Sequence, residues 1–193
     1  MNNYEYIIAC LPVIKRDEAA LQAADVGKII AEIKEQCSVK DNALVDFLLD
    51  GFNPEKLDRD FYLKALSHGN PFIRDYFSYD LKLRNTRTIF QNKALGRDED
   101  TDTVILDDGL EDWETRKEVN AVLENPDTLE RERGLDELMW EKCEEQTQLR
   151  VFDINVILSF IARLKIVDRW AGLDPETGRG LFYKLIDEIK KTK

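Results

Sequence analysis

Four of the five prolines in this chain directly follow an asparagine or an aspartate, and no other feature constrains the fold as strongly. The side chain of Asn or Asp accepts a hydrogen bond from a free N–H of a first helical turn. Proline fits the first helical position because it has no N–H to leave unpaired. The pairs therefore predict a mostly helical chain. They are Asn53-Pro54, Asn70-Pro71, Asn125-Pro126 and Asp174-Pro175.

The spacing of the apolar residues predicts an all-α fold, an irregular multi-helix bundle formed by residues 1–193 as a single helical domain. The segment 4–13 is apolar and is either a first helix or a short N-terminal extended segment. Asp41 is expected to cap a short helix that Gly51 closes, and Gly96 is expected to end the longest one. The expected helices are 18–36, 43–49, 54–66, 71–96, 113–123, 126–146, 152–170 and one that follows Pro175.

Two of these helices are expected to carry the core. Helix 152–170 is apolar on most faces, and only Asn155, Ser159 and Arg163, which step by four, are expected to form a narrow strip that faces water. Helix 71–96 has an apolar stripe at spacings of three, four or close multiples. That stripe comprises Phe72, Tyr76, Tyr79, Leu83, Phe90 and Ala94.

Charge narrows the classes of partner. The formal net charge is −11, and nine acids without a base lie between Asp98 and Glu114, so the rest of the chain carries about −2. Neither part has the basic stripe that phosphate contacts require, so we expect no nucleic acid partner. The apolar run 154–167 is too short to span a bilayer and holds two basic residues, so we expect no direct membrane insertion. The predicted loop at about 98–112 is the acidic feature of the domain.

Reactive constellations are not evident in the sequence. Asp98, Asp100 and Asp102 match the first ligands of an EF-hand loop, but Thr103 stands where glycine is needed and Gly109 where a bidentate Glu is needed. The single histidine, the three widely spaced cysteines and an incomplete Gly-rich loop at 178–180 complete no triad, zinc site or nucleotide site. We therefore expect no catalytic residue, no metal site and no cofactor, and a reduced cytoplasmic location.

A few residues stand out as candidates for interaction. Asn85 is a poor residue for the middle of a helix, so it either has a hydrogen-bonding role or faces water. The tryptophans are core or rim residues, and Arg169-Trp170 at a helix end is a candidate interface anchor because both types are frequent at interfaces. The candidate interaction residues are Arg84, Asn85, Arg97, Trp140, Arg169 and Trp170.

Three parts of the sequence resemble a bacterial family of unassigned biochemistry that is encoded with V-type ATPase subunits. The first is the opening 4–12, which ends in Leu11-Pro12. The second is 77–97, with Arg84-Asn85 at its centre and Gly96-Arg97 at its end. The third has its matching residues in 129–140 and 169–182: Leu129, Glu130, Arg131, Glu132, Leu135, Asp136, Leu138, Trp140, Arg169, Trp170, Leu173, Asp174, Glu176, Gly178 and Phe182.

That family is similar, in turn, to the C-type cap protein of V-type and archaeal-type ATPases, an all-helical component that seats the central shaft on the membrane ring. The resemblance implies a non-catalytic coupling component in proton or sodium transport, cytoplasmic and peripherally associated with the inner membrane through its partners. A partial cap and an assembly factor both stay open, because the chain is much shorter than a full cap protein. The alternatives are a free-standing helical adaptor that uses the acidic loop, and a carboxylate-based metal enzyme with ligands from the same loop.

Overall fold

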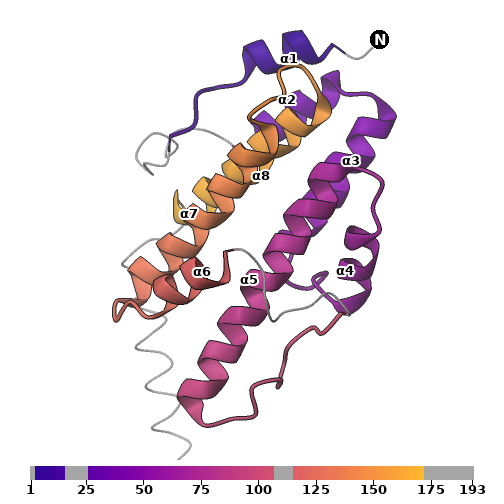
Figure 1. Ribbon diagram of the computed structural model, residues 1–193. Helices are drawn as coiled ribbons and strands as arrows, with labels where there is room; N and C mark the ends of the chain where they lie inside the picture. Colours follow the sequence, from indigo (N-terminus) through magenta and orange to yellow (C-terminus); the bar gives the residue numbers. More distant parts are fainter. Residues whose placement is uncertain (1–2, 16–25, 107–114, 172–193) are drawn as a thin grey trace, which may run out of the picture.

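Within residues 3–15, 26–106 and 115–171, which the computed structural model describes, every regular element is an α-helix, as the sequence predicts (Figure 1). The N-terminal segment that was open between helix and extended chain is helical over Tyr4–Cys10. The helices are α1 (Tyr4–Cys10), α2 (Val26–Gln36), α3 (Val39–Asp50), α4 (Arg59–Leu66), α5 (Pro71–Leu95), α6 (Arg116–Leu123), α7 (Thr128–Thr147) and α8 (Ile154–Ala171).

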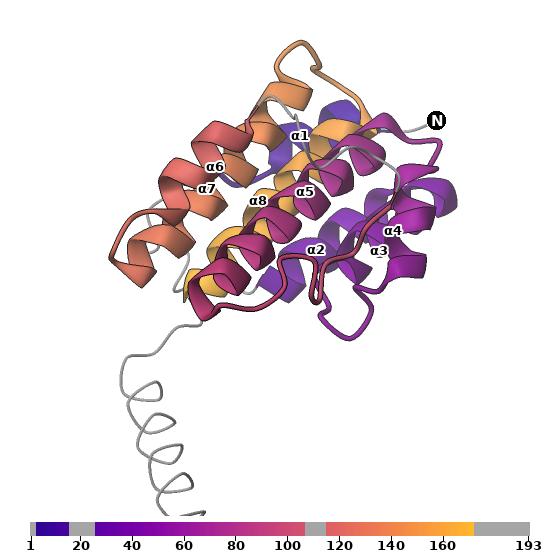
Figure 2. The same cartoon turned by 60° about the horizontal axis from the view of Figure 1, so that its bottom comes forward.

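Helix α8 lies at the centre of the bundle. It packs against α1, α2, α3, α5 and α7, while α5 packs against α4, α6, α7 and α8. Figures 1 and 2 show α5, α7 and α8 running side by side, with α6 beside α7 and with α3 and α4 on the other side of α5. Figure 1 also shows α1 lying across the end of this group. The close approach of α6 and α7 depends on Gly134, because a Cβ there would lie 2.6 Å from a methyl carbon of Val122.

The Asn-Pro signal is confirmed at the start of α5. The Asn70 side chain accepts a hydrogen bond from the Ile73 N–H at 3.0 Å, and Pro71 occupies the first turn. The other end is also confirmed, because Gly96 adopts a left-handed conformation with φ of 64° and its N–H bonds back to the helix.

Three predicted caps are wrong, for related reasons. Asn53 and Asn125 each accept a hydrogen bond from the N–H two residues later, so both Asn-Pro pairs form turns rather than helix starts. The helices begin a few residues beyond these turns, with Asp58 capping α4 and Asp127 capping α7. In α3 the cap is Ser38, whose hydroxyl accepts from the Asp41 N–H at 3.2 Å. Asp174-Pro175 and the helix expected after it lie outside the described residues.

The predicted stripe of α5 is buried at its first four positions, whereas Phe90 is half-buried and Ala94 is exposed. The predicted wet strip of α8 is wrong. Asn155 and Ser159 are buried, and Arg163 is half-buried beside α7. The Ser159 hydroxyl donates to the Cys143 carbonyl at 3.0 Å, and Asn155 accepts from Asn70 at 2.9 Å. Spacing identified a polar row but not the helix that it faces.

Candidate interaction surfaces

Arg169 and Trp170, predicted as a pair, meet a carboxylate of another helix. The Trp170 indole N–H donates to Asp136 Oδ2 of α7 at 2.6 Å, and the Arg169 guanidinium pairs with the same oxygen. Arg169 also lies 4.0 Å from Glu132, one turn before Asp136. The guanidinium of Arg133 lies 5.4 Å from the centre of the Trp170 ring, so the indole is bracketed by cations.

This assembly also reaches α5. Arg87 of α5 bonds to Glu132 at 2.5 Å, so three helices share one set of ion pairs. We call Arg87, Glu132, Arg133, Asp136, Arg169 and Trp170 the Asp136 cluster. Burial raises the pKa of Asp136 above its ordinary value, and the favourable contacts from Arg169 and Trp170 only partly oppose this rise. Trp170 is half-buried while Arg169 is exposed, so the cluster both joins helices and presents a surface.

Asp136 and Glu132 were not among the predicted candidates. Both belong to the segment that carries the family resemblance, and their spacing of four places them on one face of a helix. That spacing was the available signal. It gives no indication that Arg169, which lies 33 residues later in the sequence, would face them.

Trp140 lies in the core. Its side chain is 4% exposed, its indole N–H donates to Glu144 at 2.7 Å, and the Arg163 guanidinium lies 5.2 Å from its ring centre. Of the two tryptophans predicted as candidates, therefore, Trp140 is a packing residue and Trp170 is at the rim. Trp113 lies outside the described residues.

Arg84 joins α5 to α4 through a shared acid. Its Nε lies 3.0 and 2.9 Å from the two oxygens of Asp80, and the Tyr62 hydroxyl donates to Asp80 at 2.7 Å. Because Asp80 and Tyr62 are buried while Arg84 is about half exposed, the guanidinium closes this contact from the solvent side. Burial is also the main reason that the pKa of Tyr62 is raised.

Asn85 has the hydrogen-bonding role, and it does not face water. Its amide donates to the Val104 carbonyl at 2.9 Å and accepts from the Val104 N–H at 3.0 Å. Farther along α5, Asn92 donates to the carbonyls of Thr101 at 2.7 Å and Glu99 at 3.2 Å. Both amides are buried, so they hold the following segment against α5 (Figure 1).

We call this segment, 97–106, the acidic strap. It is the described part of the predicted acidic loop, and it has no regular secondary structure. Arg97 begins it with an exposed side chain and a backbone N–H bonded to the Asn92 carbonyl at 2.9 Å. The four acids of the strap, Asp98, Glu99, Asp100 and Asp102, are exposed, and Glu99 pairs with Lys93 at 3.1 Å. The strap is a fixed acidic surface, apart from the Asp136 cluster.

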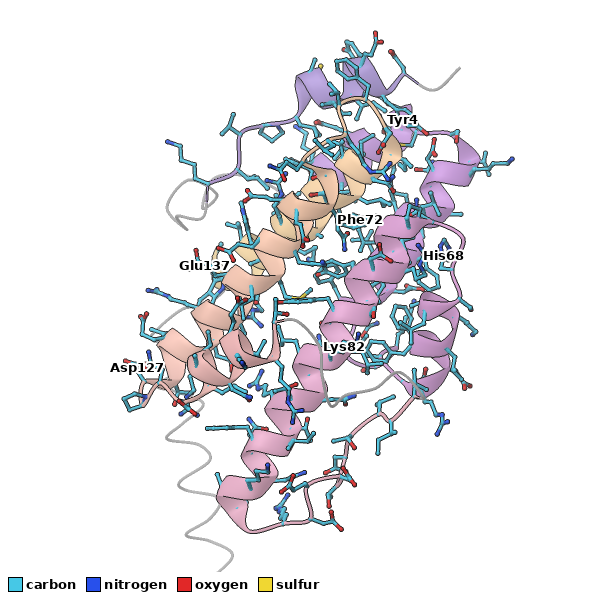
Figure 3. The ribbon with its side chains drawn as sticks, in the orientation of Figure 1. Tyr4, His68, Phe72, Lys82, Asp127 and Glu137 are labelled. Atoms are coloured by element: carbon cyan, nitrogen blue, oxygen red, sulfur yellow. The ribbon has the colours of Figure 1, made fainter. Side chains whose placement is uncertain are left out.

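The sequence predicts no metal site, and within the described ranges no group of three or more His, Cys, Asp or Glu side chains is placed to hold a metal ion. His68 lies between α4 and α5, where its Nδ1 accepts the Asn70 N–H at 3.0 Å and its ring packs 5.0 Å from that of Phe47 (Figure 3). Among the helices that the structure describes, none is both long enough and apolar enough to cross a membrane.

Comparison with known proteins gives one match. The family described as "Protein of unknown function (DUF2764)" matches residues 53–193, well over half of the chain. The matched range includes α4 to α8, and therefore the Asp136 cluster and the acidic strap. No curated protein and no solved structure matches the chain.

Proposed function

The chain belongs to the DUF2764 family of proteins of unknown function, and from this premise we propose that it is a non-catalytic component of a V-type ATPase. In this role it is similar to the C-type cap protein and couples the central shaft to the membrane ring during proton or sodium transport. It is cytoplasmic and is held at the inner membrane by the other ATPase subunits.

The Asp136 cluster is the observation that carries the proposal. Two separate parts of the family resemblance, 129–140 and Arg169-Trp170, supply Asp136 and its two partners, and these meet in space. The resemblance therefore coincides with a built assembly rather than with scattered surface residues. Its Arg169 guanidinium is about half exposed, which leaves it able to contact another protein.

The bundle supports a coupling role in a second way. A component that transmits torque must resist deformation, and densely packed interiors transmit strain. Helix α8 contacts five other helices, so a force applied at the Asp136 cluster, at the end of α8, reaches α1, α2 and α3 through one continuous element.

Co-purification tests this function. An affinity-tagged copy, recovered from host membranes after mild solubilisation, is expected to bring down the catalytic subunits of the V-type ATPase, identified by mass spectrometry. Arg169→Glu should reduce their recovery at least severalfold, because it reverses the exposed charge of the cluster. Arg150→Glu is the matched control, since Arg150 is exposed in the turn between α7 and α8 and pairs only with Asp153 nearby. Recovery of no ATPase component with the unaltered protein would refute the proposal.

A second candidate function is a free-standing adaptor, and the acidic strap favours it. Asn85 and Asn92 fix the strap on α5, so its exposed carboxylates form a preorganised surface that a basic partner can bind without first ordering a loop. Neutralising Asp98, Asp100, Asp102, Asp107 and Asp108 should then abolish partner capture in a pull-down. If capture of the ATPase subunits survives these changes, the strap is not the surface that holds them.

A further inference from the structure

A groove lies between α5, α6 and α7, on a face that neither the Asp136 cluster nor the acidic strap occupies. Its volume is about 720 Å³, enough for several side chains, and it is open to solvent. Lys82, labelled in Figure 3, marks the α5 side. The lining residues are Asp75, Ser78, Tyr79, Lys82, Thr115, Glu118, Leu138, Glu141, Lys142 and Glu145.

Negative charge predominates in this lining, which has four carboxylates and two amines. Lys142 pairs with Glu145 at 2.7 Å, and Asp75 with Arg74 at 3.2 Å. Glu118 of α6 and Glu141 of α7 are exposed and have no ion-pair partner in the part of the chain that the structure describes. The groove therefore presents two uncompensated carboxylates, one on each of two helices.

The wall between these carboxylates is aromatic and aliphatic. Tyr79 is buried, and the Lys142 ammonium lies 5.8 Å from the centre of its ring. Burial raises the pKa of Tyr79, a side-chain hydrogen bond with Thr115 opposes this, and the charges of Glu118, Glu141 and Glu145 add to the rise. The negative field of the three glutamates therefore converges on an apolar surface formed by Tyr79 and Leu138.

This arrangement discriminates between classes of ligand. Within the described ranges the carboxylates do not come together in a group that could hold a metal ion. Separate anions beside an apolar wall instead match separate cations on a scaffold that also carries apolar groups. A helix with lysines or arginines at a spacing of four and leucine-like residues on the adjacent positions has that chemistry.

We propose that the groove between α5, α6 and α7 binds a basic amphipathic helical segment of a partner protein. Its cationic side chains pair with Glu118 and Glu141, and its apolar side chains cover Tyr79 and Leu138. This inference goes beyond the proposed function, because it rests on the lining of the groove and holds whichever assembly contains the protein.

A labelled peptide tests the proposal with the full-length chain. The probe is a fluorescein-labelled amphipathic peptide of Lys-Leu-Ala-Ala repeats, and its binding is followed by fluorescence anisotropy. Glu118→Gln combined with Glu141→Gln should weaken binding about tenfold, because both uncompensated charges are lost. Asp98→Asn combined with Asp100→Asn removes the same charge from the acidic strap and should change binding by less than about twofold. Equal losses in the two variants would mean non-specific attraction and would overturn the proposal.

Two further measurements locate the peptide and identify the class of ligand. In methyl NMR spectra, titration should shift the signals of Leu138, in the groove, and leave those of Leu95, exposed at the end of α5, unchanged. Unchanged Leu138 signals during binding would contradict the proposal. Spermine, which carries separate cations without apolar side chains, should compete poorly, and displacement of the peptide at equal concentration would assign the groove to a polyamine instead. Neither result depends on the recovery of ATPase subunits, so the two proposals can fail independently.

Discussion

Helices α5 and α8 are the two long axes of the bundle that reach the most neighbours, and they are stabilised differently. Seven of the nine buried residues of α8 are apolar. Helix α5 also buries Asp80, Asn85, Thr86 and Asn92, and three of these four bond to other segments. In α8 burial supplies the free energy of folding, whereas in α5 polar contacts determine which segments attach and where.

This difference has a physical basis. Apolar burial is non-directional and scales with the area removed from water, so α8 can pack against five helices with the same kind of side chain. The acidic strap and α4 offer α5 backbone groups and a tyrosine hydroxyl. These need partners of defined geometry because an unpaired buried polar group is expensive.

The largest expected effect removes apolar volume from α8. Leu158 is fully buried, and Leu158→Ala should lower the free energy of unfolding by about 3 to 4 kcal/mol, since it leaves a cavity among helices that cannot all move inward. Urea titration followed by circular dichroism measures this loss. Leu95→Ala, at an exposed site at the end of α5, is the control and should change stability by less than about 1 kcal/mol. Comparable losses at both sites would remove the distinction between α8 and the surface of α5.

The second effect tests the polar role of α5. Asn85→Ala leaves both the N–H and the carbonyl of Val104 without their partner, so it should cost about 2 kcal/mol. Hydrogen exchange should also accelerate in 98–106, because the strap loses one of its two clamps. Thr88→Ala is the matched control, since that hydroxyl bonds only to the Arg84 carbonyl of its own helix. Unchanged exchange in the strap would contradict the clamp.

The two ends of α5 show how far the sequence could specify an element. Asn70, Pro71 and Gly96 act locally, on N–H groups within a few residues, so the bounds of α5 were predictable. Asn53-Pro54 carries the same local signal and forms a turn, because its side chain bonds two residues on and α4 starts at a better-placed cap, Asp58. Local rules identify the possible caps, and packing selects among them.

The candidate surfaces show a different limit. The sequence identified Asn85 as unusual and Arg169-Trp170 as a pair, because these observations need only the residues themselves. It could not identify Val104 or Asp136 as their partners, because those contacts depend on how the strap folds back on α5 and how α7 lies along α8. The polar strip of α8 was misassigned for the same reason, since the Cys143 carbonyl that Ser159 binds belongs to α7.

The third effect is a dependence of stability on pH that arises where α7 meets α8. Burial raises the pKa of the Cys143 thiol from 9.0 to about 12. The folded protein therefore keeps the thiol neutral where the unfolded chain ionises. The resulting stability is fully present below about pH 9 and is lost as pH rises toward 12. Between about pH 8 and about pH 10 this loss should be about 1 kcal/mol.

Cys143→Ala isolates this contribution. The variant is expected to be less stable at neutral pH because it loses buried volume, but its stability should fall less steeply over the same pH range. Buried Tyr76 and Tyr62, whose pKa values are also raised, remain in both proteins and give both a decline at still higher pH. Parallel curves for the two proteins between about pH 8 and about pH 10 would show that the thiol is not shielded as the structure implies.

The smallest effect compares two arginines on α8 that sit over tryptophan rings at nearly the same distance. Arg163 lies 5.2 Å from the Trp140 ring centre and Arg169 lies 5.3 Å from that of Trp170. Their side chains are 21% and 49% exposed. Arg163→Ala should cost about 1 kcal/mol, because a largely buried guanidinium also leaves Glu144 and packing contacts behind. Arg169→Ala should cost about 0.5 kcal/mol or less, because solvent screens its ion pairs. Thermal unfolding of the two variants measures the difference. A loss at Arg169 as large as that at Arg163 would make it a folding residue and would weaken the argument that its exposed charge serves a partner.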